Sequence, residues 1–237
     1  MSNQIKLLSV LFSLSVLAIL SSCETEDPGP LQQAEKDFSI VDFDRLEMGS
    51  ALHIRVEEAP TYEIHASGDR RNVDDLEVFK SGNTLMIRFN DNSNRVHETY
   101  ITITMPRLRS ANFSGASDSQ VSGFESDEEL DFSLSGASIC QLHAGYREVN
   151  VVLTGASTLY MTGLGDQIHG EISGASVLHA YDFPVREADV DISGASRGKI
   201  TVTDELHAVA TGASSLLYRG NPSVTSTVSG ESSVRKD

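Results

Sequence analysis

The sequence lacks tryptophan and has only two cysteines, Cys23 and Cys140. It also lacks a CxxC pair, an HExxH motif and a phosphate-cradling glycine loop. These absences remove the usual sequence signatures of a zinc site, a redox site and a nucleotide site. We therefore expect no cofactor, and we identify no catalytic constellation by motif.

Basic residues are scarce, with 18 Lys and Arg against 34 Asp and Glu, and the formal net charge is −16. Loss of an N-terminal signal containing Lys6 would leave 17 basic and 34 acidic residues, or about −17. A chain this acidic repels phosphate-rich surfaces. The charge argues against nucleic acid or anionic lipid as a partner.

No hydrophobic run is long enough to span a membrane. The longest, Leu7 to Leu20, follows Lys6 and ends in the polar residues before Cys23. A charged start, a short apolar core and small residues before a cleavage point are typical of a secretory signal peptide, here residues 1–22. An ordinary signal peptide with Cys23 nearby by chance is the less favoured alternative to a lipoprotein signal.

The letters LSSC, ending at Cys23, resemble the lipobox of bacterial lipoproteins. The resemblance implies cleavage before Cys23, a diacylglyceryl group on its sulfur and an acyl group on its amine. Two or more acyl chains hold a protein firmly at a membrane. We therefore expect a lipid-anchored protein of the cell envelope, at the outer membrane, on either its periplasmic or its surface side.

Residues 23–37 are acidic, contain two of the six prolines and show no apolar period. We interpret them as a flexible tether. The acidic residues directly after Cys23 also resemble a surface-export signal of some Gram-negative phyla, and a solvated spacer is the alternative.

A four-residue motif, SGAS or TGAS with one variant SGES, occurs seven times. The spacing between successive copies is 18 to 21 residues. A short period kept over seven copies predicts a solenoid. The motif glycines are Gly115, Gly136, Gly155, Gly174, Gly194, Gly212 and Gly230.

Apolar and polar residues alternate on both sides of each motif, which indicates short strands with one inward face. The sequence predicts an all-β, right-handed parallel β-helix of about seven coils, stacked about 4.8 Å apart. Glycine would permit the corner, the alanine would point inward, and the serines would form a hydroxyl ladder. Seven equivalent serines indicate architecture, because a nucleophile is needed only once.

Residues 38–110 alternate without the motif. We expect antiparallel β-hairpins that cover one end of the stack and join the first coil through Met105-Pro106. These strands and the repeats of residues 111–237 would form one domain, residues 38–237.

Residues 38–237 resemble the putative auto-transporter adhesin, head GIN domain family, a domain of unknown function. The resemblance depends on TITMPRL at residue 102, on the recurring SGAS and TGAS motifs and on the lipobox. It implies an all-β, β-helical domain on the cell envelope and no established catalytic residue.

One outward face combines histidines with carboxylates. His169, Asp189 and His207 would occupy neighbouring strands, with Glu171 and Asp191 alongside. Such a face could share a divalent ion or serve a polysaccharide-acting enzyme. The alternative is a solvated face with cross-strand pairs.

Columns and motif spacing predict three further features. Cys140 aligns with leucines and should be buried. Tyr160 and His179 share an outward column with Gln120, Gln141, Lys199 and Leu217, and could stack on sugar rings. Asp127-Glu128-Glu129 should be a solvated loop.

Three functions remain open: a non-catalytic binding module for a glycan or an envelope protein, a polysaccharide-acting enzyme that uses the Asp and His face, and a passive envelope component. The first accounts best for the anchor, the repeated face and the missing catalytic set.

Overall fold

Strands account for most of the computed structural model, which describes residues 29–91 and 95–237. The predicted signal peptide and Cys23 lie outside the described residues. The elements are β1 (Gln33–Asp37), β2 (Arg45–Met48), β3 (His53–Glu58), β4 (Glu63–Asp69), α2 (Arg70–Asp74), β5 (Leu76–Ser81), β6 (Thr84–Phe89), β7 (Thr99–Met105), β8 (Ser110–Phe113), β9 (Asp118–Leu134), β10 (Ile139–Leu153), β11 (Thr158–Ile172), β12 (Val177–Ile192), β13 (Arg197–Ala210), β14 (Ser215–Arg219), β15 (Ser223–Val228) and β16 (Ser233–Lys236).

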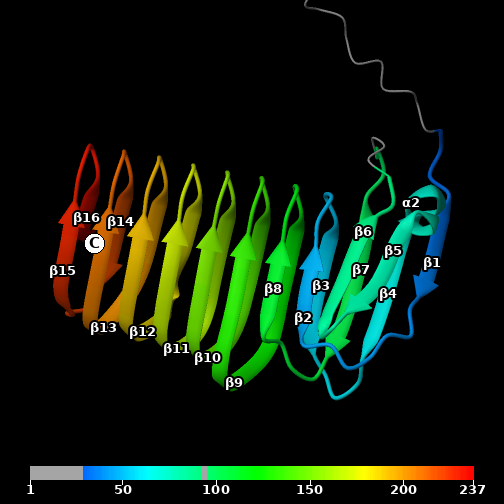
Figure 1. Cartoon of the computed structure of the whole chain (residues 1–237), viewed down its shortest axis with the longest axis horizontal. Helices are drawn as coiled ribbons and strands as arrows, with labels where there is room; N and C mark the ends of the chain where they lie inside the picture. Colours follow the sequence, from blue (N-terminus) through cyan, green and yellow to red (C-terminus); the bar gives the residue numbers. More distant parts are fainter. Residues whose placement is uncertain (1–28, 92–94) are drawn as a thin grey trace, which may run out of the picture. The chain divides into compact units, whose positions relative to one another are not determined.

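The strands β9 to β13 each form one coil and pair in parallel in chain order (Figure 1). Equivalent residues of successive repeats are register partners, as in the series Gln141, Tyr160, His179 and Lys199. Like residues therefore fall in columns along the stack. The predicted all-β, right-handed parallel β-helix of about seven coils is confirmed.

Every coil of the repeats bends twice, once at the corner motif and once midway through the long strand, and this produces two sheets (Figure 1). We call the outward side of the sheet built from β1, β4, β7, β3, the first halves of β9–β13, β14 and β16 face A. Face B is the outward side of the sheet built from β5, β6, β2, β8, the second halves of β9–β13 and β15. The inward side chains of both sheets form one continuous apolar core.

The corner glycines are required for two reasons. Their φ angles lie between +72° and +81°, a left-handed conformation that strains other residues. In addition, a Cβ on the six later motif glycines would lie 2.3 to 2.8 Å from the carbonyl oxygen of the preceding motif glycine. That oxygen accepts a hydrogen bond from the next motif's third residue at 2.7 to 2.9 Å.

The orientation expected for the corner alanine is wrong. The alanines are exposed, whereas the serine that closes the motif is buried in the first six copies, with an exposed fraction of at most 1%. Alanine and serine are both small, so size alone did not decide which of them points inward.

The hydroxyl ladder forms only in part. Ser117 donates to Ser138 over 3.0 Å, and Ser138 donates to the Ser135 carbonyl over 2.8 Å. Midway along the stack, the buried hydroxyls of Ser176 and Ser196 have no hydrogen-bond partner among the described residues.

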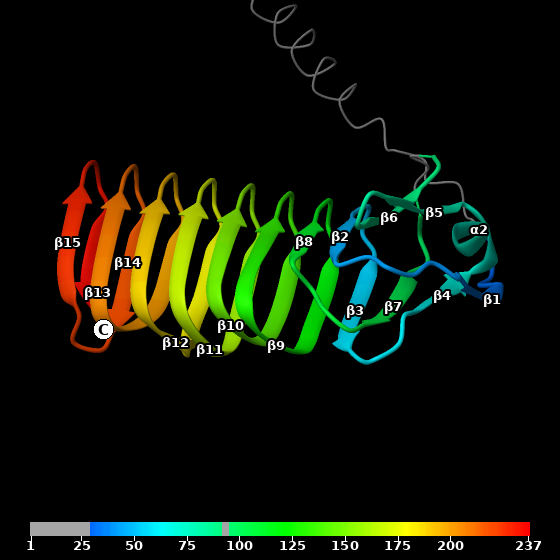
Figure 2. The same cartoon turned by 60° about the horizontal axis from the view of Figure 1, so that its bottom comes forward.

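The region before the repeats mixes two kinds of pairing. The expected antiparallel pairing is present where β4 pairs with β1 and β7, and where β5 pairs with β6. Strand β2, however, lies parallel between β6 and β8, and β3 lies parallel between β7 and β9. These strands add coils to the solenoid without a corner motif. Figure 2 shows the antiparallel strands and α2 at the end beyond them.

The predicted tether is too long at its C-terminal end. Strand β1 (Gln33–Asp37) pairs with β4 over its whole length, and the compact unit begins at Leu31. The sequence of β1 shows no apolar alternation because this edge strand is held by backbone hydrogen bonds and not by buried side chains.

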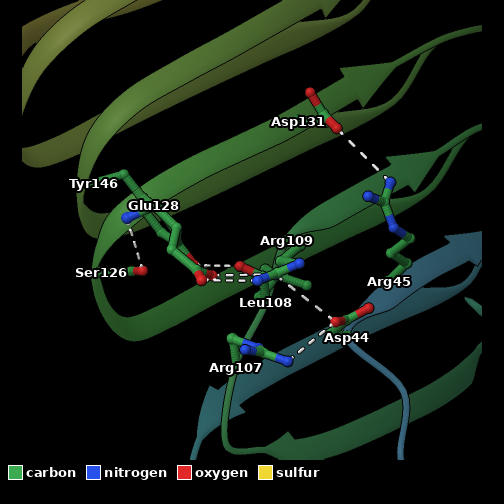
Figure 3. Close-up of polar contacts among 9 residues, drawn as sticks. All are labelled: Asp44, Arg45, Arg107, Leu108, Arg109, Ser126, Glu128, Asp131 and Tyr146. Carbon is green, nitrogen blue, oxygen red and sulfur yellow. Dashed lines mark hydrogen bonds and ion pairs between the residues drawn. The ribbon is translucent and has the colours of Figure 1, made fainter. Parts of the chain in front are cut away.

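The connection from β7 to β8 runs past the β2–β3 coil and is held there by charges (Figure 3). The Asp44 side chain, 8% exposed, lies 3.3 Å from the Arg107 guanidinium and 3.9 Å from that of Arg109. Arg109 also donates a hydrogen bond to Glu128 over 2.7 Å. The Arg109 guanidinium lowers the pKa of Glu128, and the Glu128 carboxylate raises the pKa of Arg109. Glu128 belongs to β9, so the predicted loop at residues 127–129 is instead part of a strand.

A buried tyrosine of the next coil, Tyr146, also binds the connection between β7 and β8. The Tyr146 hydroxyl donates to the Leu108 carbonyl over 2.7 Å. Burial raises the pKa of Tyr146, so this hydroxyl remains a donor at physiological pH.

Candidate functional site

The two faces of the solenoid differ in charge. Face B offers three outward positions on each of β9–β13, and eight of these fifteen residues are acidic and none is Lys or Arg. The fifteen outward residues are Glu129, Asp131, Ser133, Glu148, Asn150, Val152, Gln167, His169, Glu171, Glu187, Asp189, Asp191, Glu205, His207 and Val209. Most of the net negative charge of this part of the solenoid therefore lies on one side.

Neutral and histidine side chains separate many of these carboxylates. Asn150 donates to Asp131 over 3.0 Å, and Gln167 donates to Glu187 over 2.9 Å. Carboxylates directly opposite one another on adjacent strands repel, so an interposed amide relieves the repulsion.

The histidine and carboxylate face predicted from the sequence separates into pairs. His169, Asp189 and His207 are register partners, as expected. His207 Nδ1 lies 2.9 Å from Asp189 Oδ1, which raises the pKa of His207, whereas His169 Nε2 lies 3.5 Å from Glu148 Oε1. No three His, Cys, Asp or Glu side chains of the described residues lie close enough together to hold a metal ion.

Face A has the opposite character. Its three outward positions on each of β10–β14 contain no Asp or Glu, whereas the preceding row, on β9, begins with Asp118. These residues are Ile139, Gln141, His143, Thr158, Tyr160, Thr162, Val177, His179, Tyr181, Arg197, Lys199, Thr201, Ser215, Leu217 and Arg219. Neutral polar groups, rings and cations occupy this side.

The rings of Tyr160 and His179 stack on each other, with centroids 4.7 Å apart and planes 3° from parallel. The two ring faces that contact each other are therefore not available to a sugar. The other face of Tyr160 remains available on the β10 side. Burial and the nearby Lys199 ammonium lower the pKa of His179, which keeps this ring neutral.

A shallow hollow of about 270 Å³ lies on that side of Tyr160. Its outward polar lining comes from Gln120, Gln141, His143 and Thr162, and His143 Nδ1 lies 2.9 Å from the Thr162 hydroxyl. Amides, a hydroxyl and an imidazole can both donate and accept hydrogen bonds. The hollow therefore offers one aromatic wall and several convergent polar groups, the usual composition of a small-molecule site.

The sequence did not single out the basic residues at the C-terminal part of face A. Arg197, Lys199 and Arg235 form no ion pair with any residue of the described ranges, although the Lys199 ammonium lies 5.9 Å from the Tyr181 ring centroid. Arg219, by contrast, binds Asp237 at 2.8 Å and lies over Tyr181. Sorting charged residues by column shows where these cations lie, but only the side-chain contacts show which of them are paired.

Cys140 is fully buried, as predicted, and burial raises the pKa of its thiol to about 12. A thiol in this state is a poor nucleophile.

A larger groove of about 710 Å³ follows the bends of β9–β11, and glycines such as Gly163 and Gly165 form much of its lining. Within the described ranges, no helix has the length and apolar character needed to cross a membrane.

The structure resembles several solved structures. It superposes on a structure described as a putative adhesin from Bacteroides fragilis with a TM-score of 0.79 and 18% identity, covering 87% of this chain and 97% of that one. For a putative adhesin from Parabacteroides distasonis, the TM-score is 0.72 and the identity 15%, with 88% and 98% covered. A structure from the same species described as a putative lipid binding protein gives 0.71 and 16%, with 86% and 96% covered. At these identities the likeness establishes the fold alone.

No curated protein matches the chain significantly. The model of one protein family, however, matches residues 42–222, most of the solenoid and the strands before it. The resemblance noted on the repeated motif is thereby confirmed, and the chain belongs to the putative auto-transporter adhesin, head GIN domain family.

Proposed function

We propose that the protein is a non-catalytic, lipid-anchored protein of the cell envelope whose face A binds glycans. The observation that carries the proposal is the hollow beside Tyr160, next to the outward positions of β10–β14 on face A, which carry no carboxylate. The family description and the adhesin names of similar structures support a binding role.

A glycan fits this site better than an apolar ligand. Sugar rings present hydroxyl groups at their edges and C–H groups on their faces. Gln120, Gln141 and Thr162 supply donors and acceptors for the hydroxyls, and Tyr160 supplies an aromatic surface for a ring face. A hollow of about 270 Å³ is near the lower limit of ligand sites, which suits one sugar unit of a longer polymer.

A catalytic role at the histidine and carboxylate face has no comparable support. Asp189 and His207 pair on face B, with side chains 54% and 49% exposed. Enzymes that cleave glycosidic bonds need a carboxylic acid kept protonated by a partly dry environment. An open strand face does not supply that environment.

The test is binding of the purified mature protein to arrays of bacterial envelope and surface polysaccharides. A Tyr160→Ala variant should lose most of the binding. The matched control is Tyr100→Ala, because Tyr100 also lies on face A, is 46% exposed against 45% for Tyr160, and also stacks on a histidine, His53, at 5.0 Å. Absence of any binding, or equal losses in the two variants, would contradict the proposal.

The lipid anchor requires its own test. Replacing Cys23 with serine should release the protein from the membrane fraction, if the lipobox is processed as its resemblance implies. Treatment of intact cells with a non-permeant protease would then separate surface from periplasmic placement. Degradation in intact cells would favour adhesion to external glycans, and protection would favour binding inside the envelope.

A further inference from the structure

We infer that the glycan bound by face A is anionic, and that Arg197, Lys199 and Arg235 bind its acidic groups. The inference depends on the proposed function and specifies its ligand class. It rests on the position of these cations, on their lack of ion-pair partners and on the charge of the opposite face.

The three cations are concentrated on one small area of a strongly acidic chain. Arg197 and Lys199 are outward neighbours on β13, and Lys199 is in register through Leu217 with Arg235 on β16. Lys199 and Arg235 are thus two coils apart, or about 10 Å at the usual strand spacing. A row of separated cations matches repeated acidic groups along a polymer better than a single compact anion.

Their availability contrasts with that of several arginines that already have an acidic partner. Arg88, Arg109, Arg147 and Arg186 each have a carboxylate of a neighbouring residue or coil within 3.3 Å. Arg197, Lys199 and Arg235 have no such partner within the described part of the chain, and the outward positions around them on β12–β14 before the bend carry no carboxylate. Their charge is therefore free to bind an external anion.

The row of cations continues the column that contains the hollow. Register partners lead from Gln141 through Tyr160 and His179 to Lys199. A chain with one sugar in the hollow, beside Gln141, would meet Lys199 about 14 Å further along the column, three coils on. One linear ligand can thus occupy both the polar hollow and the cations.

Face B determines which side of the protein can approach such a polymer. Its eight carboxylates on β9–β13 repel an acidic chain, whereas face A attracts it. Because repulsion on one side and attraction on the other act together, an anionic glycan should bind to face A only. Nucleic acid and anionic membranes carry the same charge sign but offer no separate sugar ring for the hollow.

The experiment compares polygalacturonate with its fully methyl-esterified form, which has the same backbone without the charge. The mature protein should bind the acid form, and binding should weaken as salt is raised. A triple variant, Arg197→Gln with Lys199→Gln and Arg235→Gln, should bind the acid form at least about fivefold more weakly, because each exposed ion pair contributes modestly. Its binding to neutral polysaccharide should be unchanged.

The matched control changes the net charge equally at paired sites, as Arg88→Gln with Arg147→Gln and Arg186→Gln. Equal losses in both triple variants would show a general charge effect and overturn the inference. Equal binding of the acid and ester forms would overturn it while leaving glycan binding intact. Absence of binding to any polysaccharide would refute the proposed function itself. Binding of phosphatidylglycerol vesicles or single-stranded DNA as strong as that of polygalacturonate, and dependent on the same three residues, would assign the site to a different partner.

Discussion

The corner glycines predict a stability cost that can be divided into its causes. In a Gly155→Ala variant, the alanine would have to adopt a φ of +77°. Its Cβ would lie 2.5 Å from the Gly136 carbonyl oxygen. That oxygen also accepts the hydrogen bond from the Ala156 amide over 2.7 Å. The substitution therefore strains the backbone and forces two coils apart at the same point.

The magnitude follows from three contributions. The left-handed conformation costs alanine about 1 kcal/mol after the gain from a less flexible unfolded chain. Loss of the hydrogen bond between coils costs about 1 kcal/mol more. Forcing extra volume into a packed position costs about 1 to 3 kcal/mol. We expect Gly155→Ala to destabilise the protein by about 3 to 5 kcal/mol.

The matched control is Gly82→Ala, in the turn between β5 and β6. Gly82 has a φ of +58°, and no atom lies within 4 Å of the position of an added Cβ. An alanine at this position has the same backbone strain as at Gly155 but makes no steric contact between coils. The free energy of unfolding should therefore fall by only about 1 kcal/mol.

The assay is urea denaturation followed by far-UV circular dichroism, because the chain has no tryptophan to report by fluorescence. The denaturant slope must be compared between variants, since a solenoid can unfold one part at a time. Losses that agree within about 0.5 kcal/mol would refute the reasoning, because stacking would then add nothing to the requirement for glycine.

Three further predictions concern single groups. The Cys140 thiol, whose pKa burial raises to about 12, should remain unmodified by a maleimide in the folded protein and react once urea unfolds it, as read from the mass of its peptide; modification of the folded protein would contradict its burial. Tyr146→Phe leaves the Leu108 carbonyl without its 2.7 Å donor and should cost about 1 to 2 kcal/mol in urea denaturation, and an unchanged midpoint would argue against this bond. His207 should titrate in NMR above the pKa of a free imidazole, and Asp189→Asn should lower its pKa, because the hydrogen bond to Asp189 favours the charged ring. Because the pKa of His207 is raised in the folded protein, the stabilisation by the His207–Asp189 pair is present below the unfolded pKa of His207 and is lost as pH rises through its folded pKa. A His207 pKa that Asp189→Asn leaves unchanged would contradict the pair.

The repeat allowed the solenoid and its columns to be predicted because one glycine per coil fixes both the corner and the register. The inward position of Cys140 and the row from His169 to His207 followed from that register. The coil formed by β2 and β3 could not be predicted in this way. It has no corner motif, and its neighbours in space are not its neighbours in the chain.

Side-chain contacts were harder to predict than columns. His169 pairs with Glu148 and not with Asp189, because long side chains reach diagonally to the preceding coil. The stacking of Tyr160 on His179 depends on ring orientation, which alternation does not specify. The cations of face A became apparent only when ion-paired and unpaired side chains could be distinguished.

The position of the β2–β3 coil has a consequence for synthesis of the chain. This coil leaves the ribosome first among the stacked strands, yet it must be enclosed on one side by β6 and β7 and on the other by β8 and β9. Its pairings therefore wait until at least residue 122 has emerged. The coils from β10 onward each add to a completed neighbour. The slow step of folding should thus be the pairing of the β2–β3 coil with β6 and β7 on one side and β8 and β9 on the other, because these contacts span the longest stretches of chain. Growth towards the C-terminus should follow rapidly, one repeat at a time.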